Sequence, residues 1–132
     1  MDWKLEDKGS DYRVYTTSKE FNGDLYVVTI WVDKSIKSDK FWIGVSSGKK
    51  RKHRKIFEEK EYKSKGGLKA LLWVKDSIFD FPIYYGNTYN KKQYICVHWA
   101  DARRRDIYSR LERYGFHFVF EDGQKILMKK LG

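Results

Sequence analysis

The fold prediction depends first on the segment Asn22-Gly23-Asp24-Leu25-Tyr26-Val27-Val28-Thr29-Ile30-Trp31-Val32. Asparagine followed by glycine is a strong signal for a tight hairpin turn, so we predict that Tyr12–Thr16 pairs with Leu25–Val32. Both alternating sets of side chains in Leu25–Val32 are apolar, which is typical of a strand that is covered on both faces. We therefore expect a central strand with helices over each face of its sheet.

Downstream of this hairpin, apolar runs predict more strands, and apolar residues at helical spacing predict two helices. One helix begins near Gly67 and ends at Phe81-Pro82, and the other runs from an N-cap at Asp101 to a stop at Gly115. The additional strands are expected at Phe41–Val45, Ile56–Tyr62, Tyr94–Trp99, Phe116–Phe120 and Ile126–Met128. The predicted fold class is α/β (α+β), a single domain over residues 1–132 with a mixed, mostly antiparallel sheet and the order β-β-β-β-α-β-α-β-β.

The composition excludes several classes of protein. With 41% apolar residues, 17% aromatic residues and one Pro, the 132-residue chain is unlike disordered or collagen-like sequences. It shows neither a signal-peptide pattern nor an apolar run near the roughly 20 residues of a membrane helix. Cys96 is the only cysteine, which rules out an intrachain disulfide and fits a reducing compartment. We expect a cytoplasmic protein that does not bind membranes.

Cys96 and His98 lie two residues apart on a predicted strand and so face the same way. Such a pair suits a metal site or a thiolate–imidazole pair, but a complete metal site needs more ligands. The chain has only three histidines and no clustered acidic partner beside this pair. We therefore treat both residues as part of the core and expect no metal.

The second part of the chain carries motifs of a known family. Tyr62-Lys63-Ser64-Lys65-Gly66-Gly67-Leu68 leads into a helix, and a strand at Tyr94–Trp99 is followed by Asp101-Ala102-Arg103-Arg104-Arg105-Asp106-Ile107-Tyr108, Leu111–Tyr114 and Gly115-Phe116. This order resembles the pyrophosphate loop, arginine–alanine helix and closing leucine–glycine–phenylalanine of the GNAT superfamily of acyl-CoA-dependent N-acetyltransferases. The resemblance covers roughly residues 56–131 and ends in a hairpin at Phe118–Leu131.

The resemblance implies a GNAT-like fold and direct attack of an amine on the thioester of acetyl-CoA. This reaction needs a base for the amine proton and an acid for the leaving thiolate. Tyr108 is the candidate acid, with Tyr114 as the alternative counterpart, and Glu59 or Glu61 is the candidate base. The same residues also fit a structural role, as a tyrosine packed on the sheet and surface glutamates paired with lysines.

The segment before the first helix is a candidate phosphate cradle. A helix N-terminus offers unpaired N–H groups and the positive end of the helix dipole. The cofactor-binding candidates for acetyl-CoA are Lys63, Ser64, Lys65, Gly66 and Gly67. An ordinary strand-to-helix turn with solvated lysines is the alternative interpretation.

The charge balance points to a second class of function. Lys and Arg number 28 against 18 Asp and Glu, a net charge of +10 that favours phosphate-rich partners. The candidate contacts for nucleic acid or an acidic protein are Lys49, Lys50, Arg51, Lys52, Arg54 and Lys55, together with Arg103 and Arg104. A solvated loop and an exposed helix face are the alternatives. A non-catalytic protein of this kind fits an accessory role in a phage or another mobile element.

The two functions predict different structures. An enzyme predicts an open slot between the strands at Ile56–Tyr62 and Tyr94–Trp99, with Gly66 and Gly67 at its mouth. A binding protein without catalysis predicts that this slot is filled by side chains. The sequence alone leaves the choice open, because function depends on the site and not on the fold.

Overall fold

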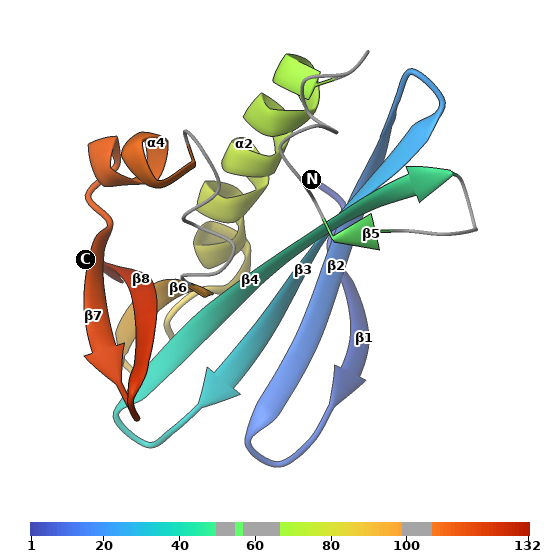
Figure 1. Ribbon diagram of the computed structural model, residues 1–132. Coiled ribbons are helices and arrows are strands. Elements are labelled where there is room, and N and C mark those ends of the chain that lie inside the picture. The colour runs from blue at the N-terminus through green and yellow to red at the C-terminus, as the bar shows by residue number, and fades with distance from the viewer. Residues whose placement is uncertain (50–54, 57–66, 99–106) are drawn as a thin grey trace.

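The computed structural model describes residues 1–49, 55–56, 67–98 and 107–132. A single twisted sheet runs through these residues in the order β1-β2-β3-β4-β6-β8-β7, and the short β5 also pairs with β4 (Figure 1). Neighbouring strands are antiparallel except β4 and β6, which are parallel. The strands are β1 (Lys4–Lys8), β2 (Tyr12–Phe21), β3 (Asp24–Lys34), β4 (Ser38–Lys49), β5 (Lys55–Ile56), β6 (Lys92–His98), β7 (His117–Glu121) and β8 (Gln124–Leu131); the helices are α2 (Gly67–Tyr85) and α4 (Ile107–Arg113).

The predicted α/β class with its GNAT-like order is wrong, because the sheet dominates. Strands hold more than twice as many described residues as the helices do. The error lies in the expectation that β3 needs a helix on both faces. Val28 and Ile30 are buried in the core that includes α2, but Trp31 on the opposite face is 46% exposed. The sequence also gave no sign of β1, whose five side chains are all exposed.

Two hairpin turns form where the sequence predicted them. Asn22 and Gly23 have φ angles of 50° and 87°, and Asp122 and Gly123 have φ angles of 52° and 75°. Positive φ at both central residues is the type I′ turn, whose twist matches that of paired strands. These turns fix the register of β2 with β3 and of β7 with β8.

The long helix α2 packs on one face of the sheet. It begins at Gly67 as predicted, but it continues past Pro82 to Tyr85. Leu68 and Leu72, although apolar, are exposed. The buried face consists of Ala70, Val74, Ser77, Ile78 and Phe81. Within the described residues, no helix is both long enough and apolar enough to cross a membrane.

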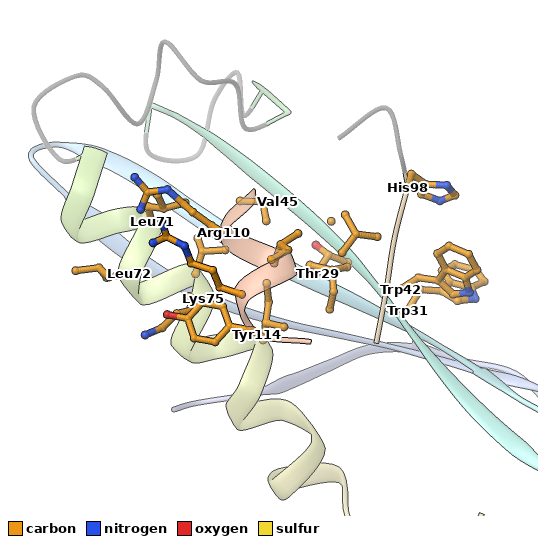
Figure 2. Close-up of a pocket in the computed structure, with 17 residues that line it drawn as sticks. Thr29, Trp31, Trp42, Val45, Leu71, Leu72, Lys75, His98, Arg110 and Tyr114 are labelled. Carbon is orange, nitrogen blue, oxygen red and sulfur yellow. The ribbon is translucent and has the colours of Figure 1, made fainter. Parts of the chain in front are cut away.

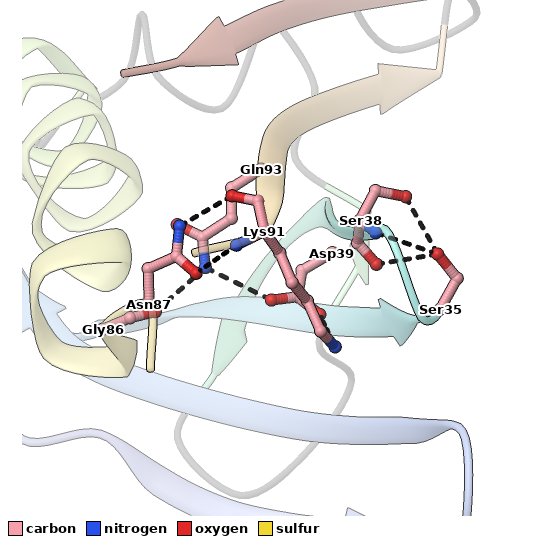
Figure 3. Close-up of polar contacts among 7 residues, drawn as sticks. All are labelled: Ser35, Ser38, Asp39, Gly86, Asn87, Lys91 and Gln93. Carbon is pink, nitrogen blue, oxygen red and sulfur yellow. Dashed lines mark hydrogen bonds and ion pairs between the residues drawn. The ribbon is translucent and has the colours of Figure 1, made fainter. Parts of the chain in front are cut away.

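A buried polar cluster joins the end of α2 to the start of β4 and β6 (Figure 3). The Asp39 carboxylate is 3% exposed and accepts hydrogen bonds from Lys91 Nζ and Gln93 Nε2, each at 3.2 Å. Gln93 Nε2 also donates to the Gly86 carbonyl at 2.9 Å. Asn87 Nδ2 donates a hydrogen bond to the Lys91 carbonyl at 2.7 Å, and the Lys91 N–H donates to Asn87 Oδ1 at 2.8 Å. These contacts tie the loop after α2 to the parallel strand pair.

Candidate functional site

A cavity lies where β4 and β6 separate. Their parallel pairing ends at Trp42 and Cys96, and the next described pairing on this edge of β4 is Ser46 with β5. Residues just beyond the last β4–β6 pair line a cavity of about 460 Å³ (Figure 2). These strand residues are Ile43, Gly44 and Val45 of β4, and Val97 and His98 of β6.

The two helices form the apolar wall of this cavity and place cations at it. Leu71, Val74 and Ile78 of α2 and Leu111 of α4 supply the apolar side chains. The cationic lining residues are Lys75 of α2 and Arg110 and Arg113 of α4. An apolar space bordered by three cations suits a ligand that has an apolar or neutral segment and an anionic group.

A turn at the C-terminal end of α4 fixes the position of this helix beside the cavity. Gly115 has a φ of 92°, a left-handed conformation that glycine adopts without strain. The Phe116 N–H donates to the Leu111 carbonyl at 3.2 Å, and Lys129 Nζ donates to the Tyr114 carbonyl at 2.6 Å. The Tyr114 ring lies against Phe79 of α2, with a centroid distance of 5.5 Å. The cation-bearing helix is therefore fixed to both α2 and β8.

Aromatic side chains form a row on the opposite side of the opening. Trp31 and Trp42 are partners in the β3–β4 register, and both line the cavity. Tyr12 stacks on Trp31 with 4.8 Å between centroids, and His98 stacks on Trp42 at the same distance. Figure 2 shows Trp31, Trp42 and His98 on the other side of β4 from Lys75 and Tyr114. We call Tyr12, Trp31, Trp42 and His98 the aromatic row.

The environment of Cys96 does not favour the ionised thiolate that a cysteine nucleophile needs. The side chain is fully buried, and desolvation raises the pKa of its thiol from 9.0 to about 12, with Lys40 acting in the opposite direction. The thiol is therefore protonated near neutral pH. Cys96 is a core residue as predicted, whereas His98 is exposed and was wrongly assigned to the core. In the described part of the chain, no three His, Cys, Asp or Glu residues form a group that could hold a metal.

Most of the residues predicted for the site lie outside the described residues: Glu59, Glu61, Lys63, Ser64, Lys65, Gly66, Lys50, Arg51, Lys52, Arg54, Arg103 and Arg104. Gly67 is the first residue of α2, and Tyr108 lies in the first turn of α4. Lys49 ends β4 and Lys55 begins β5, so the basic run connects these two antiparallel strands. Of the two strands expected to border the slot, Ile56–Tyr62 lies outside the described residues except for Ile56, and the cavity lies between β4 and β6.

Trp31, Trp42 and His98 were not predicted as residues of this site. One signal was present in the sequence. A hairpin centred between Ile36 and Lys37 places Trp31 opposite Trp42, and two large aromatic residues facing each other on neighbouring strands are a candidate binding surface. The separation of β4 from β6 had no signal of this kind.

A second cavity, of about 390 Å³, lies beside the end of α2. Its charged lining residues are Arg13, Lys34, Asp39 and Lys91, and four tyrosines also border it. Lys91 and Asp39 form an ion pair at 3.2 Å. The second cavity shares no lining residue with the first.

No model of a known protein family matches the chain, and neither a curated protein nor a solved structure matches it. The resemblance to acyl-CoA-dependent N-acetyltransferases therefore depends on the sequence motifs alone.

Proposed function

We propose that the protein is a small acyl-CoA-dependent N-acetyltransferase that binds acetyl-CoA in the cavity between β4 and β6. The observation that carries the proposal is the separation of two parallel strands around an apolar space with cations at its border. An extended chain with amide groups, such as the pantetheine arm of acyl-CoA, suits such an opening, because strand edges offer backbone N–H and C=O groups.

The position of α2 supports binding of the phosphates nearby. Gly67, the end of the candidate cradle, is the first residue of α2, and Leu71 lines the cavity four residues later. A rise of about 1.5 Å per residue separates them by about 6 Å along the helix axis. The N–H groups of the first turn thus lie close to Leu71, and Lys75, Arg110 and Arg113 line the same cavity, which favours a ligand with an anionic group.

The proposed reaction is attack by an amine nitrogen on the thioester carbonyl carbon. The new C–N bond forms, the C–S bond breaks, a base takes the amine proton, and an acid protonates the leaving thiolate. Tyr108 remains the proposed acid, with Tyr114 as the alternative, and Glu59 or Glu61 remains the proposed base. Tyr114 borders the cavity, and so does His98, which is a further candidate for moving a proton. Cys96 has no nucleophilic role in this scheme.

Calorimetric titration with acetyl-CoA and with free coenzyme A, at low and moderate salt, tests the proposal. We expect saturable binding that survives moderate salt, followed by thiol release when an amine acceptor is added. Arg110→Gln should weaken acetyl-CoA binding about tenfold, because a tenfold loss of affinity corresponds to the loss of about one hydrogen bond to a charged group. The matched control is Lys130→Gln, which removes an exposed cation that does not line the cavity.

Gly44→Leu provides a second variant, which adds a side chain at the border of the cavity, on the face of β4 that carries Trp42. A Cβ at Gly44 would have the Thr29 carbonyl oxygen as its nearest neighbour, at 3.9 Å, so the side chain has room to extend. We expect Gly44→Leu to abolish acetyl-CoA binding and Gly44→Ala to retain it. Equal binding by the wild type and Gly44→Leu would contradict the assignment of the cavity, and no binding by the wild type would refute the proposed function.

The aromatic row favours a second candidate function, the binding of single-stranded nucleic acid without catalysis. Exposed aromatic rings stack on bases, and each stacked base contributes about 1–3 kcal/mol. The net charge of +10 favours attraction to phosphates.

Quenching of tryptophan fluorescence by an oligothymidylate tests this candidate. We expect Trp42→Ala to weaken binding and Tyr89→Ala, an exposed tyrosine outside the row, to leave it unchanged. Polyphosphate has the charge but no bases, so equally tight binding of polyphosphate would refute a stacking role.

A further inference from the structure

The second cavity differs from the first in the chemistry of its lining. Aliphatic side chains of both helices border the first cavity, whereas charged side chains, tyrosines and loop residues border the second. The second cavity is enclosed by β2, β3 and β4, by the end of α2 and by the loop that follows this helix. Its volume of about 390 Å³ lies in the range of about 300–1,000 Å³ that is typical of small-molecule sites. The polar lining indicates a ligand of a different class from acetyl-CoA.

The strand register places two cations at the second cavity. Arg13 lies opposite Val32 in the β2–β3 pair, and Val32 is fully buried in the core that includes α2. Opposed residues of neighbouring strands lie on the same face of a sheet, so Arg13 is on the face that α2 covers. Lys34 follows Val32 by two residues on β3 and is therefore on this face as well. Both residues line the cavity.

The positive charge of this cavity exceeds its negative charge. Its described lining residues include three cations, Arg13, Lys34 and Lys91, and one carboxylate, Asp39. Lys91 and Asp39 form an ion pair at 3.2 Å (Figure 3). In the part of the chain that the structure describes, neither Arg13 nor Lys34 forms an ion pair with a carboxylate. Two positive charges thus border the cavity without a described anion beside them.

The guanidinium of Arg13 also has a buried donor that is not used. Its Nε is buried and has no hydrogen-bond partner among the described residues. A hydrogen bond with the Tyr15 side chain raises the pKa of Arg13, so the guanidinium stays charged. A buried N–H without an acceptor is unfavourable, and anionic oxygens are the acceptors that a guanidinium binds most strongly. The cavity is therefore suited to an anion beside Arg13.

We propose that the second cavity binds a small phosphate monoester of the sugar phosphate class, with its phosphate group between Arg13 and Lys34. A phosphate monoester carries a charge of about −1.5 to −2 near neutral pH, which matches the two cations. The guanidinium fork binds two phosphate oxygens at once, and the lysine ammonium acts as a point charge. Hydroxyl groups of Tyr85 and Thr88 line the same cavity and suit the hydroxyls of a sugar. This site is separate from the proposed acetyl-CoA site, because the two cavities share no lining residue.

Calorimetric titration with ribose 5-phosphate and glucose 6-phosphate tests the ligand class. We expect saturable binding of at least one of them and no binding of ribose or glucose without the phosphate. Inorganic phosphate should bind about tenfold more weakly than the monoester, because it lacks the hydroxyls that meet the polar lining. Absence of binding by both sugar phosphates would overturn the proposal. Equal binding of inorganic phosphate would overturn the assignment to a monoester.

Substitutions at the two cations test the position of the site. Arg13→Gln should weaken binding of the sugar phosphate at least about tenfold, because it removes a charged hydrogen-bond donor. Lys34→Gln, at the end of β3 and outside the core, should also weaken binding and keeps the test valid if Arg13→Gln does not fold. Urea unfolding shows which variants are folded.

Lys37→Gln is the matched control for these variants. It makes the same change in net charge at an exposed lysine of the neighbouring β3–β4 turn, which does not line the cavity. We expect it to bind the sugar phosphate as the wild type does. Equal weakening by Lys37→Gln would indicate a general effect of net charge and would contradict a defined site. Unchanged binding by Arg13→Gln and Lys34→Gln would contradict it as well.

Discussion

The buried thiol of Cys96 makes the stability of the protein depend on pH in the alkaline range. Burial raises the thiol pKa from 9.0 to about 12, so the unfolded chain loses this proton at a lower pH than the folded chain does. The stability linked to Cys96 is therefore fully present below about pH 9 and is lost as the pH rises toward 12. The direction follows from the preference of a desolvated site for the neutral thiol.

The magnitude follows from the two pKa values. At about pH 10 the unfolded thiol is largely ionised and the folded thiol is not, which destabilises the folded state by about 1.4 kcal/mol relative to about pH 8. Urea unfolding at both pH values gives this difference in the free energy of unfolding. Other groups also titrate in this range, so the comparison is with Cys96→Ala, which retains them.

We expect the wild type to lose about 1.4 kcal/mol more than Cys96→Ala does between these pH values. A thiol reagent gives a second readout, because Cys96 should react slowly in the folded protein and quickly in urea. Identical pH dependence of the wild type and the variant would contradict a raised pKa of the Cys96 thiol, and so would rapid reaction of the folded thiol.

Three further predictions concern packing and local geometry. Phe81→Ala should lower the free energy of unfolding by about 3–5 kcal/mol, because this fully buried ring contacts Trp3, at 4.9 Å between centroids, and other core rings. Lys91→Met should cost about 3 kcal/mol by leaving the buried Asp39 carboxylate without its cation, and adding Asp39→Asn should restore part of the loss. Gly115→Ala should cost about 1–2 kcal/mol, because its φ of 92° strains any residue with a Cβ. Urea unfolding measures all three, and an unchanged midpoint in any of them would contradict the stated cause.

Local sequence signals predicted individual elements better than their arrangement. The two type I′ turns and the start of α2 at Gly67 were correct, because they depend on the conformational preferences of adjacent residues. The predicted end of α2 at Phe81-Pro82 was wrong, because the helix continues to Tyr85. Pro82 is tolerated within the last turn, and the helix turns Val74 and Phe81 toward the sheet in preference to Leu68. Which side of a helix is buried depends on the surface that it meets.

The turns, most of the strand positions, the surplus of positive charge and the absence of an intrachain disulfide follow from the amino-acid sequence alone. Two features depend on the tertiary structure. Trp31 is exposed on a face without a described helix, and β4 and β6 separate beyond Trp42 and Cys96, which leaves the cavity. Turns are set by the backbone preferences of a few neighbouring residues. Cavities and uncovered faces depend on contacts between segments far apart in the chain. The side-chain pattern of one strand does not specify which segment packs against it.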